Sequence, residues 1–267
     1  MRKISVIIPT FNQARYLSAC LDTLWFQDYP NMEMIVVNDG STDTTQQVLE
    51  EYVMALTGDK VSYACNYNKA LDKVERCYHK RYPGKGRELK IINHIQNQGL
   101  GVTLNTGFRV TTGVYCTFIA SDDMLLPTAI SDLTAVIEKN NADFAYADMH
   151  IVDDTGRILR RFSLPDYTFE KVFCHWYLCG VCKLYRRKLH DKLGYYDEKI
   201  KPQDHEMYLR FAMNGARFVH VPKVLANVRI HDSDRQVDNH TPKNWNKLYE
   251  ESAALVMKAR RYLAKSA

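Results

Sequence analysis

The feature that most constrains this fold is the alternation of short apolar strands with helical patterns near the N-terminus. Residues 4–8 form an apolar run that ends at Pro9 and Thr10, and the next segment places its apolar residues on one helical face. A second strand pattern over residues 34–37 leads into a turn rich in Asx and hydroxyl residues, then into another helical pattern. Strand–helix–strand–helix is the order of a parallel sheet, so the sequence predicts an α/β fold.

Two adjacent carboxylates follow a further strand pattern. Residues 114–120 are rich in β-branched and aromatic side chains, Asp122 and Asp123 come directly after them, and Pro127 opens a helical pattern. Open α/β sheets bind ligands at the carboxyl ends of their strands, and paired carboxylates suit a divalent cation. The alternative is that Asp122 only caps the following helix. The same edge of the sheet should hold three further polar residues: Thr10, Asn12 and Asp39.

An ordered set of motifs extends this pattern along the chain. The motifs are residues 5–12, residues 36–43, residues 97–107, Ser121-Asp122-Asp123, residues 203–210 and Arg229-Ile230-His231. Together they resemble a family 2 glycosyltransferase of the GT-A fold, and the likeness covers residues 4–232. The resemblance implies a Rossmann-like, mixed but mostly parallel sheet flanked by helices.

The resemblance also implies a set of site residues. Asp122, Asp123 and His231 would hold Mn²⁺ or Mg²⁺, and Asp204 would be the catalytic base of an inverting transfer. The nucleotide-binding residues would be Pro9, Thr10, Phe11, Asn12, Asp39, Asn97, Gly99, Ser121 and Asp122. The expected reaction moves a sugar from a nucleotide donor, expected to be UDP-linked, to a hydroxyl of a saccharide or glycoconjugate acceptor. For Asp204 the alternative role is the N-cap of a helix.

Three residues depart from the pattern of that family. Ala120 replaces a frequent first aspartate, Leu104 a frequent arginine, and Gln203 a frequent glutamate. Ala120 and Gln203 motivate a second hypothesis, a nucleotide-sugar-binding protein that has lost catalysis. A third, a sugar-1-phosphate nucleotidyltransferase, would be expected to carry a glycine-rich basic loop after the first strand, and residues 9–12 offer none.

Two segments lie outside the matched motifs. Residues 57–90 predict an insertion in a GT-A domain of residues 1–240, with a helix over residues 63–82 and a break at residues 83–86. Its basic and aromatic residues suit a flap that contacts the acceptor or a partner, and the alternative is a solvated excursion. Residues 241–267 predict an amphipathic helix packed on the domain, with a peripheral membrane contact as the alternative.

Composition adds limits on partners and location. The net charge is +5, from 36 Lys and Arg against 31 Asp and Glu, which slightly favours anionic ligands. No apolar run approaches the roughly 18 residues of a membrane span, and no signal-peptide core follows Met1. We therefore expect a cytoplasmic protein, with the inner face of the membrane as a peripheral alternative. No nucleic-acid motif accompanies the charge, so no nucleic-acid partner is expected.

The seven cysteines favour reduced thiols, because their number is odd and no signal peptide precedes them. Cys179 and Cys182 have the spacing of a zinc-ligand pair, with Cys174 and His175 nearby. No second pair of this spacing exists, so packing of these cysteines as small apolar residues is the better interpretation.

Overall fold

The computed structural model describes residues 1–58, 61–231 and 242–266, and its centre is a nine-stranded sheet. The strand order is β5-β2-β1-β6-β10-β8-β11-β7, with β9 paired to β8. The strands are β1 (Ile4–Thr10), β2 (Met32–Asn38), β5 (Arg87–Asn93), β6 (Tyr115–Phe118), β7 (Met124–Leu125), β8 (Phe144–Val152), β9 (Ile158–Phe162), β10 (Lys183–Arg186) and β11 (Phe218–Arg229). Strands β5, β2, β1 and β6 run parallel to one another, and β8 runs parallel to β11. Strands β7, β9 and β10 pair with their neighbours in antiparallel fashion. The expectation of a mixed, mostly parallel sheet is confirmed.

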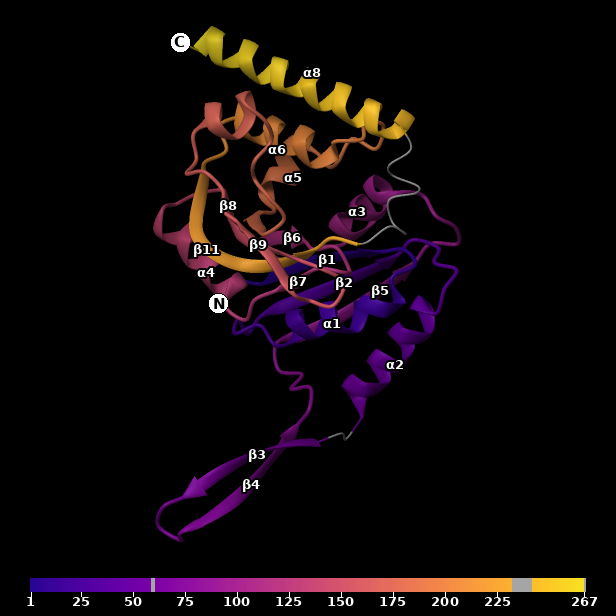
Figure 1. Cartoon of the computed structure of the whole chain (residues 1–267), viewed down its shortest axis with the longest axis vertical. Coiled ribbons are helices and arrows are strands. Elements are labelled where there is room, and N and C mark those ends of the chain that lie inside the picture. The colour runs from indigo at the N-terminus through magenta and orange to yellow at the C-terminus, as the bar shows by residue number, and fades with distance from the viewer. Residues whose placement is uncertain (59–60, 232–241, 267) are drawn as a thin grey trace.

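Helices cover this sheet on both sides. In Figure 1, α1 and α2 lie below it, and α3, α5 and α6 lie above it. The helices are α1 (Ala14–Trp25), α2 (Thr45–Thr57), α3 (Leu100–Arg109), α4 (Ala129–Lys139), the π-helix η1 (Glu170–Cys174), α5 (Lys188–Leu193), α6 (Gln203–Met213) and α8 (Pro242–Ser266). Helix α1 buries Leu17, Cys20, Leu21, Leu24 and Trp25, the stripe that its sequence predicts.

The sheet direction brings several loops to one edge. Strands β1, β2 and β6 end at Thr10, Asn38 and Phe118, and the polar motifs follow them directly. Strand β8 runs parallel to β11 along their common length, so the turn after Val152 and the segment after Arg229 arrive at neighbouring positions. Loops from both halves of the sheet therefore meet at its carboxyl edge, where α/β proteins place their sites.

The predicted helix over residues 63–82 is wrong. The segment forms a hairpin of β3 (Val61–Asn68) and β4 (Lys73–Lys80), a separate two-stranded sheet that extends away from the body in Figure 1. Its turn is built on Asn68, whose side-chain oxygen accepts hydrogen bonds from two backbone amides of the turn. The hairpin lies at the opposite end of the molecule from α6 and α8. This position gives no support to a flap that contacts the acceptor.

The C-terminal helix α8 packs on the body. Val256 and Ala259 are buried, and Arg260 Nε donates a 2.7 Å hydrogen bond to the carbonyl of Cys174 at the end of η1. The backbone amide of Lys201, before α6, donates to Glu251 of α8. The predicted boundary at residues 240–241 and residue 267 lie outside the described residues. In residues 1–58, 61–231 and 242–266, no helix combines the length and hydropathy needed to cross a bilayer.

The cysteines proposed as a zinc site lie in the core. Cys174, Cys179 and Cys182 are all buried and belong to the main hydrophobic cluster, whereas His175 is exposed. Burial among apolar side chains raises the pKa of the Cys182 thiol to about 12. A thiol in this environment stays protonated and packs as a small apolar group.

Candidate active site

The loops after β1 and β2 are tied together by Asn12. Its backbone adopts a positive φ of 53°, and its side-chain oxygen accepts hydrogen bonds from the amides of Thr42 (2.8 Å) and Asp43 (3.3 Å). The amide of Asn12 donates in turn to Ser41 Oγ. Asn12 therefore shapes the predicted nucleotide pocket by joining its two loops, a role that local sequence did not indicate.

Asp39 holds the third loop of this edge. It is 3% exposed, and its carboxylate accepts 2.9 Å hydrogen bonds from the amides of Gln98 and Gly99. His94 Nδ1 lies 2.7 Å from the same carboxylate, and its Nε2 lies 3.1 Å from Thr106 Oγ1 on α3. The predicted contact of Asp39 with a base or ribose would therefore use lone pairs that these bonds leave available.

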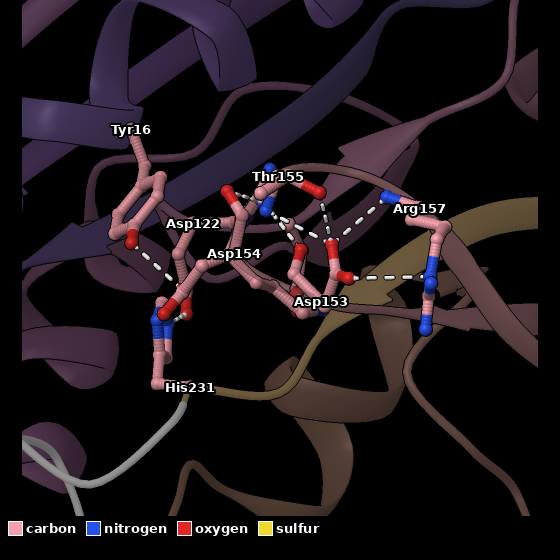
Figure 2. A network of polar contacts seen from close by, with 9 residues as sticks. Tyr16, Asp122, Asp153, Asp154, Thr155, Arg157 and His231 are labelled. Carbon is pink, nitrogen blue, oxygen red and sulfur yellow. Dashed lines mark hydrogen bonds and ion pairs between the residues drawn. The ribbon is translucent and has the colours of Figure 1, made fainter.

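Asp122 and His231 meet at this edge of the sheet (Figure 2). They are 109 residues apart in sequence, yet His231 Nε2 lies 2.8 Å from Asp122 Oδ2. His231 Nδ1 lies 2.6 Å from Asp154 Oδ1, and Tyr16 Oη donates a 2.8 Å hydrogen bond to the same oxygen. The imidazole is thus held between two carboxylates, one after β6 and one after β8. The helix-capping alternative for Asp122 is wrong, because the N-cap of α4 is Thr128.

Arg229 links the loop after β6 to the turn after β8 by hydrogen bonds. Its guanidinium donates to the carbonyls of Asp153 and Asp154, both at 2.8 Å, and lies 4.7 Å from the ring centre of Tyr16. Its backbone amide donates a 2.9 Å hydrogen bond to Asp123 Oδ1. The carboxylate of Asp123, predicted as a metal ligand, therefore commits at least one oxygen to positioning the end of β11.

Sequence reasoning missed Asp154 and Tyr16. Asp153 and Asp154 directly follow the strand pattern of β8, the same signal that identified Asp122 and Asp123 after β6. Asp153 caps the turn, because it accepts hydrogen bonds from Thr155 and from the amide of Arg157. Asp154 is thereby turned toward His231, as Figure 2 shows.

The cluster has donors of the kind that a divalent cation uses. Mn²⁺ and Mg²⁺ favour carboxylate oxygens, and Mn²⁺ also accepts imidazole nitrogen. A metal ion binds the neutral imidazole, which carries one N–H, so a metal-bound His231 would donate to only one of its two carboxylates. If Nδ1–H donates to Asp154, the lone pair of Nε2 faces Asp122, as in carboxylate–histidine–metal arrangements. Within the described part of the chain, no three His, Cys, Asp or Glu residues are arranged so that they could hold a metal ion by themselves. The fit therefore rests on Asp122 and His231 together with donor atoms from a ligand.

Asp204 lies in the first turn of α6, and its side chain is 32% exposed. Lys183 Nζ is 3.6 Å from its carboxylate and 3.8 Å from the ring centre of Phe118, the last residue of β6. The Lys183 side chain is 1% exposed, and a buried cation requires a countercharge, which Asp204 supplies. Through Lys183, Asp204 is therefore placed near the end of β6. The N-cap alternative for Asp204 is wrong, because the N-cap of α6 is Pro202.

The remaining predicted residues surround these groups. Pro9 and Thr10 end β1, Phe11 is 41% exposed beyond it, and Ser121 is buried beside Asp122. Gly99 precedes α3 with a φ of 88°, a conformation that favours glycine. Gln203 packs against α3, since a Cβ added to Gly101 would lie 2.4 Å from its side-chain nitrogen. One edge of the sheet thus combines a carboxylate–imidazole pair, glycine-containing loops and an accessible aspartate.

Comparison with known proteins identifies the family and the fold to which this edge belongs. The profile of the glycosyl transferase family 2 matches residues 5–74 and 69–194, and the chain belongs to that family. An uncharacterised glycosyltransferase of Rickettsia typhi is 28% identical over 242 residues, which cover 86% of this chain and 64% of the relative. The poly(ribitol-phosphate) β-N-acetylglucosaminyltransferase TarS of Staphylococcus aureus is 26% identical over 228 residues, which cover 83% of this chain and 34% of TarS.

Solved structures show the same fold. S. aureus TarS 1–349 in complex with UDP-GlcNAc has a TM-score of 0.65 at 22% identity and covers 88% of this chain and 61% of TarS 1–349. The mannosyltransferase PcManGT of Pyrobaculum calidifontis, in complex with GDP-Man and Mn²⁺, has a TM-score of 0.64 at 19% identity, covering 97% of this chain and 64% of that one. This chain thus spans less than two thirds of the length of these relatives.

Proposed function

We propose that this protein transfers a sugar from a UDP-linked donor to a saccharide hydroxyl, with inversion at the anomeric carbon and with the help of a divalent cation. The observation that carries the proposal is His231 held between Asp122 and Asp154 at the edge that also presents Asp204. Complexes of structural relatives with UDP-GlcNAc and with GDP-Man and Mn²⁺ support a nucleotide-sugar donor. Synthesis of a polysaccharide or glycoconjugate is the setting that we propose.

The proposed reaction is a single displacement. The acceptor oxygen forms a bond to the anomeric carbon, and the bond from that carbon to the diphosphate oxygen breaks with its electron pair on the diphosphate. The acceptor proton passes to Asp204 as general base. A divalent cation held by Asp122 and His231 would act as a Lewis acid toward the charge that develops on the diphosphate. Asp154 would orient His231, and Lys183 would orient Asp204.

Nucleotide-induced thermal stabilisation tests this proposal. UDP, GDP and CDP are added to the whole chain with Mn²⁺, with Mg²⁺ and with a chelator, since a ligand of the native state raises its apparent stability. We expect the largest rise in melting temperature with UDP and Mn²⁺, and Asp122→Ala should remove most of the gain that the metal gives. If a nucleotide raises the melting temperature equally with and without the chelator, the metal role is refuted. If no nucleotide raises the melting temperature, the donor class is refuted.

A further inference from the structure

A cavity of about 370 Å³ lies beside Asp204, where four segments of the chain meet. Trp176 and Tyr177 come from the segment after η1, Asp204 and His205 from the start of α6, and Leu248 and Tyr249 from α8; the fourth segment is the start of α3, with Leu100. We call this cavity the Trp176 pocket. Its size falls within the roughly 300–1,000 Å³ of ligand pockets. Since Asp204 forms part of its wall, a molecule bound there would meet the proposed base.

The outer part of the pocket is aromatic. The ring centres of Trp176 and Tyr249 lie 5.8 Å apart at an interplanar angle of 36°, and the two residues are 41% and 60% exposed. Exposing the apolar surface of large rings to water is unfavourable in free energy, and a ligand that covers the rings would remove this cost. The faces of these rings offer apolar contact, which suits the C–H face of a pyranose ring. The outer part of the pocket therefore favours a flat, partly apolar ligand.

The wall of the pocket also contains two stacked rings, those of Tyr177 and His205. The rings of Tyr177 and His205 stack at 5.2 Å and 18°, and both residues line the pocket. Tyr177 Oη and His205 Nε2 are buried and have no hydrogen-bond partner among the residues that the structure describes. Burial lowers the pKa of His205 to about 4, so its ring is neutral at neutral pH. Since solvent does not reach these two atoms, a ligand could bond them only after a side-chain movement, and the two rings contribute an uncharged wall.

The charge of the pocket is small. Lys201 is the one cation and Asp204 the one anion among the described residues that line it. A phosphate-bearing or carboxylate-bearing ligand would find a single lysine opposite the negative charge of Asp204. A neutral ligand that combines apolar faces with hydroxyl groups matches this lining better.

We propose that the Trp176 pocket binds the acceptor, and that the acceptor unit it binds is a neutral pyranose. The ring of the sugar packs against Trp176 and Tyr249, the reacting hydroxyl faces Asp204, and the uncharged side chains of Tyr177 and His205 form part of the wall. This inference rests on the proposed function and adds the acceptor class to it. It also gives a role to α8, which lies beyond the residues 5–194 that match the family.

Binding of methyl glycosides to the whole chain tests this inference. Saturation-transfer NMR with methyl glucosides, galactosides, mannosides and N-acetylglucosaminides should detect at least one binder without any donor. Tyr249→Ala should weaken that binding about 3- to 10-fold, the worth of one aromatic contact, and Tyr249→Phe should retain it. Tyr78→Ala is the matched control, because Tyr78 is 63% exposed on the distant hairpin.

The donor provides the second measurement. Tyr249→Ala should leave the affinity for UDP and Mn²⁺ within about twofold of wild type, since the pocket is assigned to the acceptor alone. The inference is wrong if no methyl glycoside binds, if Tyr249→Ala and Tyr78→Ala behave alike, or if octanol competes as well as the glycosides do. A wild type that binds methyl glycosides but no nucleotide would instead refute the proposed function.

Discussion

At the scale of single residues, the position of His231 depends on contacts from distant parts of the chain. Asp154 and Asp122 bond its two ring nitrogens, and Tyr16 lies with its ring centre 5.0 Å from the imidazole. Arg229 joins the backbone of both aspartate loops through its guanidinium. A histidine fixed in this way presents a defined nitrogen to a ligand without losing side-chain entropy when the ligand binds.

The first prediction concerns Asp154→Asn. The amide keeps the size of the side chain but removes the negative charge that fixes the N–H of His231. We expect the affinity for UDP in the presence of Mn²⁺ to fall about 10- to 100-fold, the usual effect of removing a residue that orients a metal ligand. Calorimetric titration measures this affinity. With a chelator, wild type and variant should bind UDP equally, because the effect acts through the metal.

The matched control is Asp191→Asn on α5, where the aspartate is half exposed and pairs with Arg187. Surface pairs of this kind contribute little, so the affinity for UDP should not change. If Asp154→Asn and Asp191→Asn bind UDP with Mn²⁺ equally well, Asp154 has no part in the site.

At the scale of elements, Glu33 joins the segments at the other end of the central strands. It is fully buried in β2, and its carboxylate accepts hydrogen bonds from Ser5 of β1, Lys90 of β5 and Thr112 before β6. Burial alone would raise the pKa of Glu33, but the hydrogen bonds from Lys90, Ser5 and Thr112 outweigh it and hold the pKa at about 2. This network is structural, since its residues lie away from the carboxyl edge.

The second prediction follows from that pKa. Between pH 4.5 and pH 2 the Glu33 carboxyl is protonated in the unfolded chain, where its pKa is near 4.5, but stays ionised in the folded protein. The stabilisation by Glu33 is therefore complete above pH 4.5 and is lost as the pH falls toward 2. A depression of this size corresponds to about 3 kcal/mol. In chemical denaturation, Glu33→Gln should lower the free energy of unfolding at pH 7 by an amount of this order, and the difference from wild type should shrink toward pH 3. The control is Glu88→Gln, since Glu88 is an exposed partner of Lys3. If the free energies of unfolding of wild type and Glu33→Gln differ by the same amount across this pH range, the role of Glu33 is contradicted.

The third prediction concerns the hairpin of β3 and β4. Its strands pair only with each other among the described residues, whereas Tyr82 after it packs against Trp25, Phe26 and Tyr52 of the body. Replacing residues 61–80 by a short Gly-Ser linker should therefore keep Tyr82 in place. We expect the midpoint of denaturation and the affinity for UDP to stay close to wild type. Residues 87–90 of the predicted insertion belong to β5 of the central sheet, so the experiment tests residues 61–80. A variant that does not fold would show that residues 61–80 are part of the core and not an insertion.

At the scale of the whole molecule, local patterns predicted the elements and the edge of the sheet, but not the contacts between distant segments. Strands β1, β2 and β6 and helix α1 follow from apolar periodicity, and the ordered motifs placed Asp122 and His231 at one edge. Asp154 and Lys183 were missed, because their positions depend on the parallel pairing of β8 with β11 and on burial against β6.

The error over residues 63–82 has a local cause. Tyrosines four residues apart, such as Tyr63 and Tyr67, or Tyr78 and Tyr82, fit a helical stripe as well as they fit alternation in a strand. The turn that decides between the two is set by Asn68 and by Asp72, whose φ is 48°. The Trp176 pocket could not be predicted either, since it requires the packing of α8 on the segment after η1.

The measurement that tests the account most directly is sugar transfer by Asp204→Asn. The amide keeps the shape of the side chain but cannot accept the acceptor proton, and it leaves the buried Lys183 without its countercharge. The binding affinity for UDP with Mn²⁺ is measured first, and a value near wild type shows that the donor site is intact. Transfer to a competent acceptor should then fall about 10²- to 10⁴-fold, in kcat and not in donor affinity. Transfer within a few-fold of wild type would contradict the assignment of Asp204 as base, and a wild type inert with every donor and acceptor would favour a binding protein that has lost catalysis.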